Sequence, residues 1–196
     1  MIPAIMNRRS IRKYKADNLP MQAVTEILRA GILAPSAKNR QPWKFVVLQK
    51  NAKNEAVQAM RRGIERERKS PLLLESAKYL EGAEHTADVM EQAPVVIMVT
   101  DPQGVSFDKP LSPEERMYEI CNAQSMGAAM ENMTLTATEL GLGSLWICDT
   151  FFAQKELTAW LCNKGEVRAA LALGYADEDP PARPRKEFDA LVSWRR

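Results

Sequence analysis

Residues 112–140 read SPEERMYEICNAQSMGAAMENMTLTATEL, and Gly141 follows them directly. The stretch predicts one long helix, because Ser112 and Glu115 have capping-box spacing, Pro113 suits the first helical position and Gly141 suits the end. Such a helix spans about 40 Å at ~1.5 Å per residue. Its apolar residues occur nearly all round, which is more than one small core needs to cover. We therefore expect a second subunit to cover one of its faces.

Outward from this helix, short apolar runs predict buried strands separated by helices of unequal length. We expect strands at residues 44–49, 94–100, 144–149 and 168–175. We expect a first helix that starts after Asn18, has Pro20 in its first turn and stops before Pro35. A second helix should run from a cap at Asn51 to about residue 68, and two more should cover residues 71–92 and 154–161. The pattern predicts an α+β or α/β sandwich around a central sheet of about four or five strands.

Composition fits a globular chain. Of the 196 residues, 45% are hydrophobic and 27% are charged, and the net charge is +2. With no linker visible, we expect a single domain over residues 1–196 and exclude a disordered protein. The near-neutral charge argues against a nucleic-acid partner. The longest apolar run, 93–99, is far shorter than the ~20 residues of a membrane helix, so we expect no membrane partner either.

The cysteines and the N-terminus bear on the compartment. Cys121, Cys148 and Cys162 show neither metal nor disulfide spacing. At the N-terminus the basic cluster follows a very short apolar stretch, which is the reverse of a secretory signal. We therefore expect a reduced, cytoplasmic protein.

Two common kinds of site find no support. The segment GLGSLW, 141–146, begins like a dinucleotide fingerprint, but a helix precedes it, a strand follows it and Trp146 replaces the third glycine. The single histidine, His85, rules out a two-histidine metal site within one chain and leaves a Ser-His or Cys-His pair without other evidence. We expect no metal and no catalytic side chain, so a bound cofactor must supply the chemistry.

Both ends of the chain carry basic clusters. In RRSIR, 8–12, the side chains of Arg8, Ser10 and Arg12 project to one side of an extended backbone and suit a phosphate. RPRK, 183–186, can complete that anion site from the C-terminal side. The alternative is that both clusters are solvated.

A Pro-bounded loop is the third candidate. In APSAKNRQPW, 34–43, the side chains of Ser36, Asn39 and Gln41 are uncharged hydrogen-bonding groups. Such groups suit the heteroatom-rich edge of a planar ligand better than a phosphate. Such a loop is also a common connection without any ligand. Residues 61–79 are the expected variable cover of a pocket.

Four segments together resemble the FMN-dependent nitroreductase family: RRSIRKY, APSAKNRQPWKFVV, NAQSMGAAMENMTLTATELGLGSLWI and LGYADEDPPARPRKEFDALV. The resemblance covers nearly the whole chain. It implies a homodimer of three-layer α/β/α sandwiches, with a mainly antiparallel central sheet, a long interface helix and an exchanged C-terminal arm. It also implies one FMN per subunit at the dimer interface.

The resemblance also assigns roles to single residues. Arg8, Ser10 and Arg185 match phosphate-binding positions, whereas Arg12 matches a basic residue near the ribityl chain and the pyrimidine edge. Arg9 is expected to make backbone contacts or none. Asn39 is expected to contact the flavin across the dimer from Arg8.

The turn before the third strand is expected to lie against the flavin ring. Members with a Glu-Gly or Thr-rich turn place a polar group near flavin N5, but here Leu145, Trp146 and Ile147 stand there, so a backbone N–H must serve. This departure leaves the substrate class open. The cofactor-binding residues implied are Arg8, Arg9, Ser10, Arg12, Pro35, Ser36, Ala37, Asn39, Gln41, Gly143, Ser144, Leu145, Trp146, Ile147, Arg183 and Arg185.

The activity implied is that of an oxidoreductase. NAD(P)H reduces FMN, which then reduces a nitroaromatic, quinone or related small molecule by a ping-pong mechanism. Flavin carries out the electron transfer while the protein binds it, orients it and adjusts its electronics. The alternatives are a flavin-binding sensor or storage protein without turnover, and a branch that performs reductive dehalogenation or enone reduction.

Overall fold

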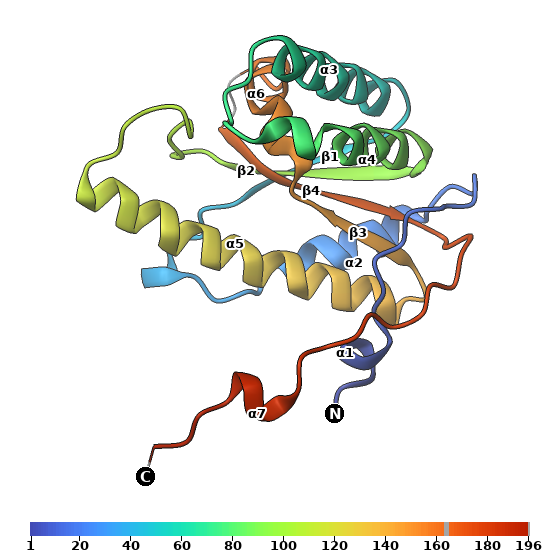
Figure 1. The fold of residues 1–196 in the computed structure, drawn as a ribbon. Helices are drawn as coiled ribbons and strands as arrows, with labels where there is room; N and C mark the ends of the chain where they lie inside the picture. Colours follow the sequence, from blue (N-terminus) through green and yellow to red (C-terminus); the bar gives the residue numbers. More distant parts are fainter. Residues whose placement is uncertain (163–164, 196) are drawn as a thin grey trace.

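The computed structural model describes residues 1–162 and 165–195, and these residues form three layers (Figure 1). Within them, four strands make one antiparallel sheet in the order β1-β2-β4-β3. The strands are β1 (Lys44–Leu48), β2 (Val95–Asp101), β3 (Gly143–Ile147) and β4 (Glu166–Gly174). The predicted α+β sandwich with an antiparallel central sheet is therefore confirmed.

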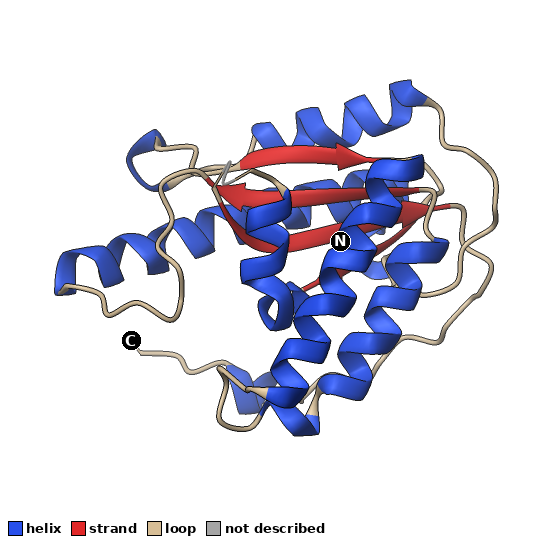
Figure 2. Cartoon of the chain, turned by 90° about the horizontal axis from the view of Figure 1, so that it is seen from above, coloured by secondary structure: helices blue, strands red, loops and turns tan. Residues whose placement is uncertain are grey.

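Helices cover both faces of the sheet, as Figures 1 and 2 show. One face carries α3 (Lys50–Lys69), α4 (Leu80–Gln92) and α6 (Gln154–Trp160), and the other carries α2 (Met21–Ile32) and α5 (Pro113–Glu139). None of the helices in the described ranges is long and apolar enough to cross a membrane.

The central strands are buried on both sides because their side chains alternate between two cores. On β2, Val96 and Met98 pack on the side of α3 and α4. Val95, Ile97 and Val99 of the same strand pack on the side of α2 and α5. Strand β1 lies at the edge of the sheet and is only half-buried, so the expectation of a fully buried strand there was wrong.

Helix α5 begins and ends as its sequence predicts. The Glu115 amide donates to Ser112 Oγ at 3.2 Å and the Ser112 amide donates to Glu115 Oε2 at 2.8 Å, which completes the capping box. Gly141 follows the helix with φ of +70°, the left-handed conformation that glycine adopts without strain. Met117 and Ile120 stay exposed near its N-terminal end.

Three helix predictions need correction. The predicted helix 71–92 begins only at Leu80, and residues 71–79 form irregular backbone with one short 3₁₀ turn, η2 (Ser76–Lys78). Asn51 is not a cap, because α3 begins at Lys50 with Gln49 before it. Pro20 precedes the first turn of α2 and does not lie within it.

The C-terminal segment leaves the three layers and runs past α5 (Figure 1). Residues 179–187 have no regular secondary structure, and a single turn of helix, α7 (Phe188–Leu191), follows. Phe188 is 63% exposed and Trp194 is 76% exposed. We call residues 183–195 the C-terminal arm. Its large apolar side chains Phe188, Leu191 and Trp194 stay exposed in this subunit.

Candidate functional site

The N-terminal basic segment is fixed against the edge of β3. Ser10 and Ser144 form a parallel bridge, and the Ile11 amide donates to the Ser144 carbonyl at 2.9 Å. A Cβ atom at Gly143 would lie 2.9 Å from the Ile11 side chain, so glycine permits this close approach. The buried Tyr14 hydroxyl donates to the Ile11 carbonyl at 2.9 Å. Two of the predicted site segments therefore lie side by side.

The basic clusters from the two chain ends meet around one cavity of about 300 Å³. Among the ion pairs of the described residues, Arg8 approaches Glu131 at 3.9 Å, and none joins a carboxylate to Arg12 or Arg185. The two clusters therefore lie close together, and anion binding between them stays a prediction. The predicted residues that line the cavity are Arg8, Arg9, Ser10, Arg12, Arg183 and Arg185.

Each arginine keeps much of its donor capacity. Arg9 donates to the Met6 carbonyl at 2.8 Å and to the Arg8 carbonyl at 2.9 Å, which are the backbone contacts expected of it. Arg185 donates to the Arg183 carbonyl at 3.1 Å. A guanidinium group has five N–H donors, so these contacts leave donors for an anion.

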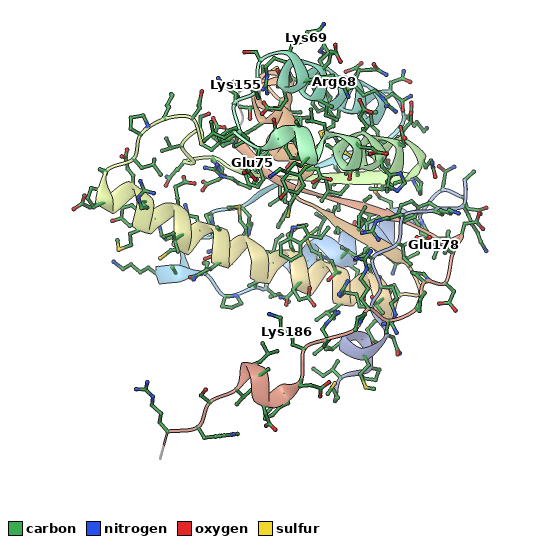
Figure 3. The ribbon with its side chains drawn as sticks, viewed as in Figure 1. Arg68, Lys69, Glu75, Lys155, Glu178 and Lys186 are labelled. Carbon is green, nitrogen blue, oxygen red and sulfur yellow. The ribbon has the colours of Figure 1, made fainter. Side chains whose placement is uncertain are left out.

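Glu178 holds the backbone of the site's N-terminal segment, and sequence reasoning missed it. Its carboxylate accepts from the backbone amides of Arg12 and Lys13, and it lies beside the N-terminal segment in Figure 3. This contact fastens the N-terminal segment to the chain that follows β4. Burial, and then the charge of Glu178, raise the pKa of Tyr14, so its hydroxyl stays protonated as a donor. The acidic run before Pro180 is the signal that could have suggested such a contact.

The Pro-bounded loop lies elsewhere, against α5. The Ala37 amide donates to Ser125 Oγ at 3.3 Å, and the Gln41 amide donates to Ser36 Oγ at 3.0 Å. Pro35, Ser36, Ala37, Asn39 and Gln41 do not line the basic cavity of their own chain.

Backbone strain marks the same loop. Lys38 and Asn39 both have φ of +53°, and Gln41 has φ of +48°. Left-handed conformations are uncommon for residues other than glycine, and they cluster at ligand-binding sites. A contact from Asn39 across the dimer stays a prediction.

The segment expected as a turn before the third strand is strand β3 itself. Leu145 and Ile147 are buried toward the core beneath α3 and α4, so only their backbone groups can serve a ligand. Trp146 points to the opposite face, where it is 38% exposed and its ring lies 3.5 Å from the Cβ position of Gly127 on α5.

A second cavity, of about 550 Å³, opens where β3 ends. The 3₁₀ segment η3 (Asp149–Ala153) and the irregular residues before α4 form its walls. Residues 61–79 were expected to cover a pocket, and four of its lining residues come from that range. The lining consists of Leu73, Glu75, Ser76, Tyr79, Phe107, Cys148, Asp149, Phe151 and Phe152.

Known proteins share this architecture. The chain is 27% identical over 194 residues to the NADH dehydrogenase of Thermus thermophilus. The alignment covers 98% of this chain and 94% of that protein. An FMN-bound protein from Desulfovibrio desulfuricans superposes with a TM-score of 0.72 at 25% identity and covers 98% of this chain and 95% of its own.

A third solved structure, the FMN-dependent nitroreductase NfnB of Mycobacterium smegmatis in complex with NADPH, has a TM-score of 0.74 at 19% identity and shares the fold. It covers 98% of this chain and 96% of its own. The profile of the Nitroreductase family matches residues 5–175, from α1 (Pro3–Asn7) to the end of β4. Since this match takes in the basic N-terminal segment, the strained loop and all four strands, the chain belongs to the Nitroreductase family.

Proposed function

We propose that this chain is an FMN-dependent oxidoreductase that takes a hydride from NAD(P)H and passes electrons to a nitroaromatic, a quinone or a related acceptor. The convergence of both basic clusters on one cavity beside β3 carries this proposal. The FMN complex from Desulfovibrio desulfuricans and the NADPH complex from Mycobacterium smegmatis support it, because both proteins have the same fold.

The donor set of the cavity fits a phosphate. Arg8, Ser10 and Arg185 offer guanidinium and hydroxyl donors, and a phosphate oxygen accepts such charge-assisted bonds well. Arg12 places a cation beside the same cavity, where it would favour negative charge on the pyrimidine side of a flavin and so raise its reduction potential. Bound FMN would supply the hydride and electron transfer, which no side chain here provides.

We propose that the working unit is a homodimer. The loop at residues 35–41 is strained yet remote from the basic cavity of its own chain, so a partner subunit would bring it to the flavin. The exposed Met117 and Ile120 on α5, and Phe188 and Trp194 on the C-terminal arm, give that partner an apolar surface to cover. Cys121, Cys148 and Cys162 are free thiols, in keeping with a cytoplasmic protein.

The electron balance is simple in either acceptor class. Two electrons and two protons convert a quinone into a hydroquinone. The same number convert a nitro group into a nitroso group and release one water. Each turnover consumes one NAD(P)H, which gives up a hydride and becomes NAD(P)⁺, and one proton from the solvent.

Absorption spectroscopy tests the proposal. The purified protein should be yellow or should take up added FMN, and NADH or NADPH should bleach the flavin band without oxygen. An added quinone should restore the band, and steady-state rates should give parallel double-reciprocal lines because both substrates use one flavin in turn. A colourless protein that takes up no FMN contradicts the assignment. Bleaching without reoxidation by any acceptor would instead indicate a sensor.

Reductive dehalogenation is the second candidate. The chain is 24% identical over 92% of its length to the iodotyrosine deiodinase of Thermotoga neapolitana. Release of iodide from an iodinated phenol, measured with the reduced enzyme, decides between this reaction and nitro or quinone reduction.

A further inference from the structure

The 550 Å³ cavity at the end of β3 has an aromatic interior. Phe107 meets Phe151 edge to face, with ring centroids 6.3 Å apart at an interplanar angle of 82°. Leu73, Tyr79 and Phe152 add further apolar surface. An apolar, aromatic cavity of this size favours a flat ring over a polar chain.

Strand β3 joins this cavity to the basic one. Ser144, near the start of the strand, pairs with Ser10 of the basic segment, and Cys148 immediately after the strand lines the aromatic cavity. Ser144 and Cys148 are four residue steps apart, which corresponds to about 13 Å at ~3.3 Å per residue. A ligand held by its phosphate at the basic end can therefore extend along β3 toward the aromatic end.

The charged side chains in the lining of the aromatic cavity are of one sign, and one of them pairs with a lysine outside the lining. Of the described residues that line it, the charged ones are Glu75 and Asp149, and both are carboxylates. Asp149 accepts from Thr86 Oγ1 at 2.5 Å, which fixes its orientation. Glu75 lies on the same side of the sheet as α3 and α4 and pairs with Lys78 at 2.8 Å (Figure 3).

Cys148, directly after β3, adds a thiol to the lining. Burial, and then the Asp149 charge, raise the pKa of Cys148, so the thiol is neutral at physiological pH. The cavity therefore offers no guanidinium or ammonium group from its lining to an anionic ligand.

The wall made by residues 71–79 is held to α3 near its start. Glu67 is buried, and one of its carboxylate oxygens accepts from the amides of Leu72 and Leu73, both at 2.9 Å. These bonds hold Leu73 in the lining. This part of the cavity wall is thus preformed, which favours selection among ligands by size and charge.

We propose that this cavity is the acceptor site and that it selects flat, uncharged aromatic acceptors over carboxylated or sulfonated analogues of the same ring. The proposal rests on the proposed function, because it assumes a reduced flavin beside the end of β3. The nicotinamide ring of NAD(P)H, itself flat, fits the same cavity in its turn, provided that its phosphates stay outside.

Two matched acceptors test the selectivity. 4-Nitrobenzamide and 4-nitrobenzoate have nearly the same shape, and only the second carries a negative charge. With NADPH as reductant, we expect kcat/KM for the amide to exceed that for the benzoate by about tenfold or more, because like charges at short range repel strongly near a protein surface. A ratio near one in an enzyme that reduces both overturns the proposal.

Variants test whether the two carboxylates of the cavity cause this difference in kcat/KM. In the double variant Glu75→Gln/Asp149→Asn we expect the amide-to-benzoate ratio to fall several-fold, whereas Glu81→Gln, which removes an exposed carboxylate of α4 outside the cavity, should leave it unchanged. A ratio that the double variant does not change overturns the proposal.

A third variant separates acceptor binding from cofactor binding. Phe151→Ala should raise KM for 4-nitrobenzamide about tenfold while the FMN content and the visible spectrum stay those of the parent. Loss of FMN from folded Phe151→Ala would assign the cavity to the cofactor and overturn the proposal. Failure of the proposed function itself looks different, since the parent protein would then bind no FMN or would not be bleached by NAD(P)H.

Discussion

Replacing Glu67 by glutamine tests how the wall of the aromatic cavity is held. The Glu67 side chain is only 1% exposed. One carboxylate oxygen accepts from the amides of Leu72 and Leu73, both at 2.9 Å, and the other contacts the guanidinium group of Arg66. Glu67→Gln keeps the shape and one acceptor oxygen but removes the negative charge and points an amide group at Arg66.

The size of the effect follows from these contacts. A hydrogen bond to a charged group contributes about 1.5–3 kcal/mol, compared with ~1 kcal/mol for a neutral pair. The carboxylate makes two such bonds to amides, while Arg66 keeps a second partner in Glu156 at 3.0 Å. We therefore expect Glu67→Gln to lower the free energy of unfolding by about 2 kcal/mol.

Urea unfolding at several pH values measures this change. Burial favours the neutral acid, but the Leu73 and Leu72 amides, with Ser76 and Arg66, outweigh it and lower the pKa of Glu67. A lowered pKa means that the stabilisation is complete above the ordinary glutamate pKa of ~4.3 and is lost as the pH falls through the lowered value. The gap between parent and variant should thus be full at pH 7 and shrink in acid.

A matched control removes the same charge from the same helix. Glu65 lies on the surface of α3, where it pairs with Arg68 and Lys69, so Glu65→Gln should change the urea midpoint little. Equal midpoints for Glu67→Gln and the parent, or equal losses in both variants, would refute the account of Glu67 as the anchor of the cavity wall.

Three further predictions concern the core, the cofactor and the dimer. Gly63→Ala should lower the free energy of unfolding by about 1–3 kcal/mol in urea titrations, because the added Cβ would lie 2.2 Å from that of Ala153. Arg185→Ala should weaken FMN about tenfold or more in fluorescence titrations, since a charge-assisted phosphate contact contributes about 1.5–3 kcal/mol; unchanged affinity would show that Arg185 is merely solvated. Truncation after Ala182 should reduce both the FMN content, measured by absorbance, and dimerisation, measured by light scattering. A truncated dimer with its full FMN would contradict this coupling.

The parts of the fold that sequence predicts well carry their signals locally. Helix α5 has its cap, its first-turn proline and its terminal glycine within its own residues, and its bounds agree with the prediction. The strands β2 and β4 are short apolar runs between helices, and they lie within a residue or two of the predicted ranges.

The predicted start of helix α4 was wrong because that boundary depends on a side-chain contact and not on helix propensity alone. Residues 71–79 were predicted to be helical, but the buried Glu67 carboxylate accepts from the Leu72 and Leu73 amides and the helix begins only at Leu80. A sequence shows that Glu67 is acidic, but not that it is buried. The same holds for the aromatic cavity, because Phe107 follows β2 and Phe151 follows β3, and β4 lies between these two strands in the sheet.

In the candidate site, too, local sequence predicts some features and long-range contacts decide the others. Alternation within 8–12 predicts which side chains share a face, and the structure places Arg8, Ser10 and Arg12 on one cavity. That residues 183–185 join them follows from the path of the chain after β4, which Glu178 fixes by its bonds to the N-terminal segment. Sequence reasoning could propose this convergence but not the contact that produces it.

The position of Arg185 links cofactor binding to assembly. Arg185 lines the basic cavity, and Phe188, three residues further along, begins the exposed apolar part of the C-terminal arm. Lys186, between them, projects from the arm below α5 (Figure 3). If the apolar residues of the arm pack on a partner subunit, dimerisation already restricts the backbone next to Arg185. FMN binding then loses less conformational entropy when it orders the Arg185 side chain. Linkage then requires the reverse effect to be equal: FMN must tighten the dimer by the factor by which the dimer tightens FMN.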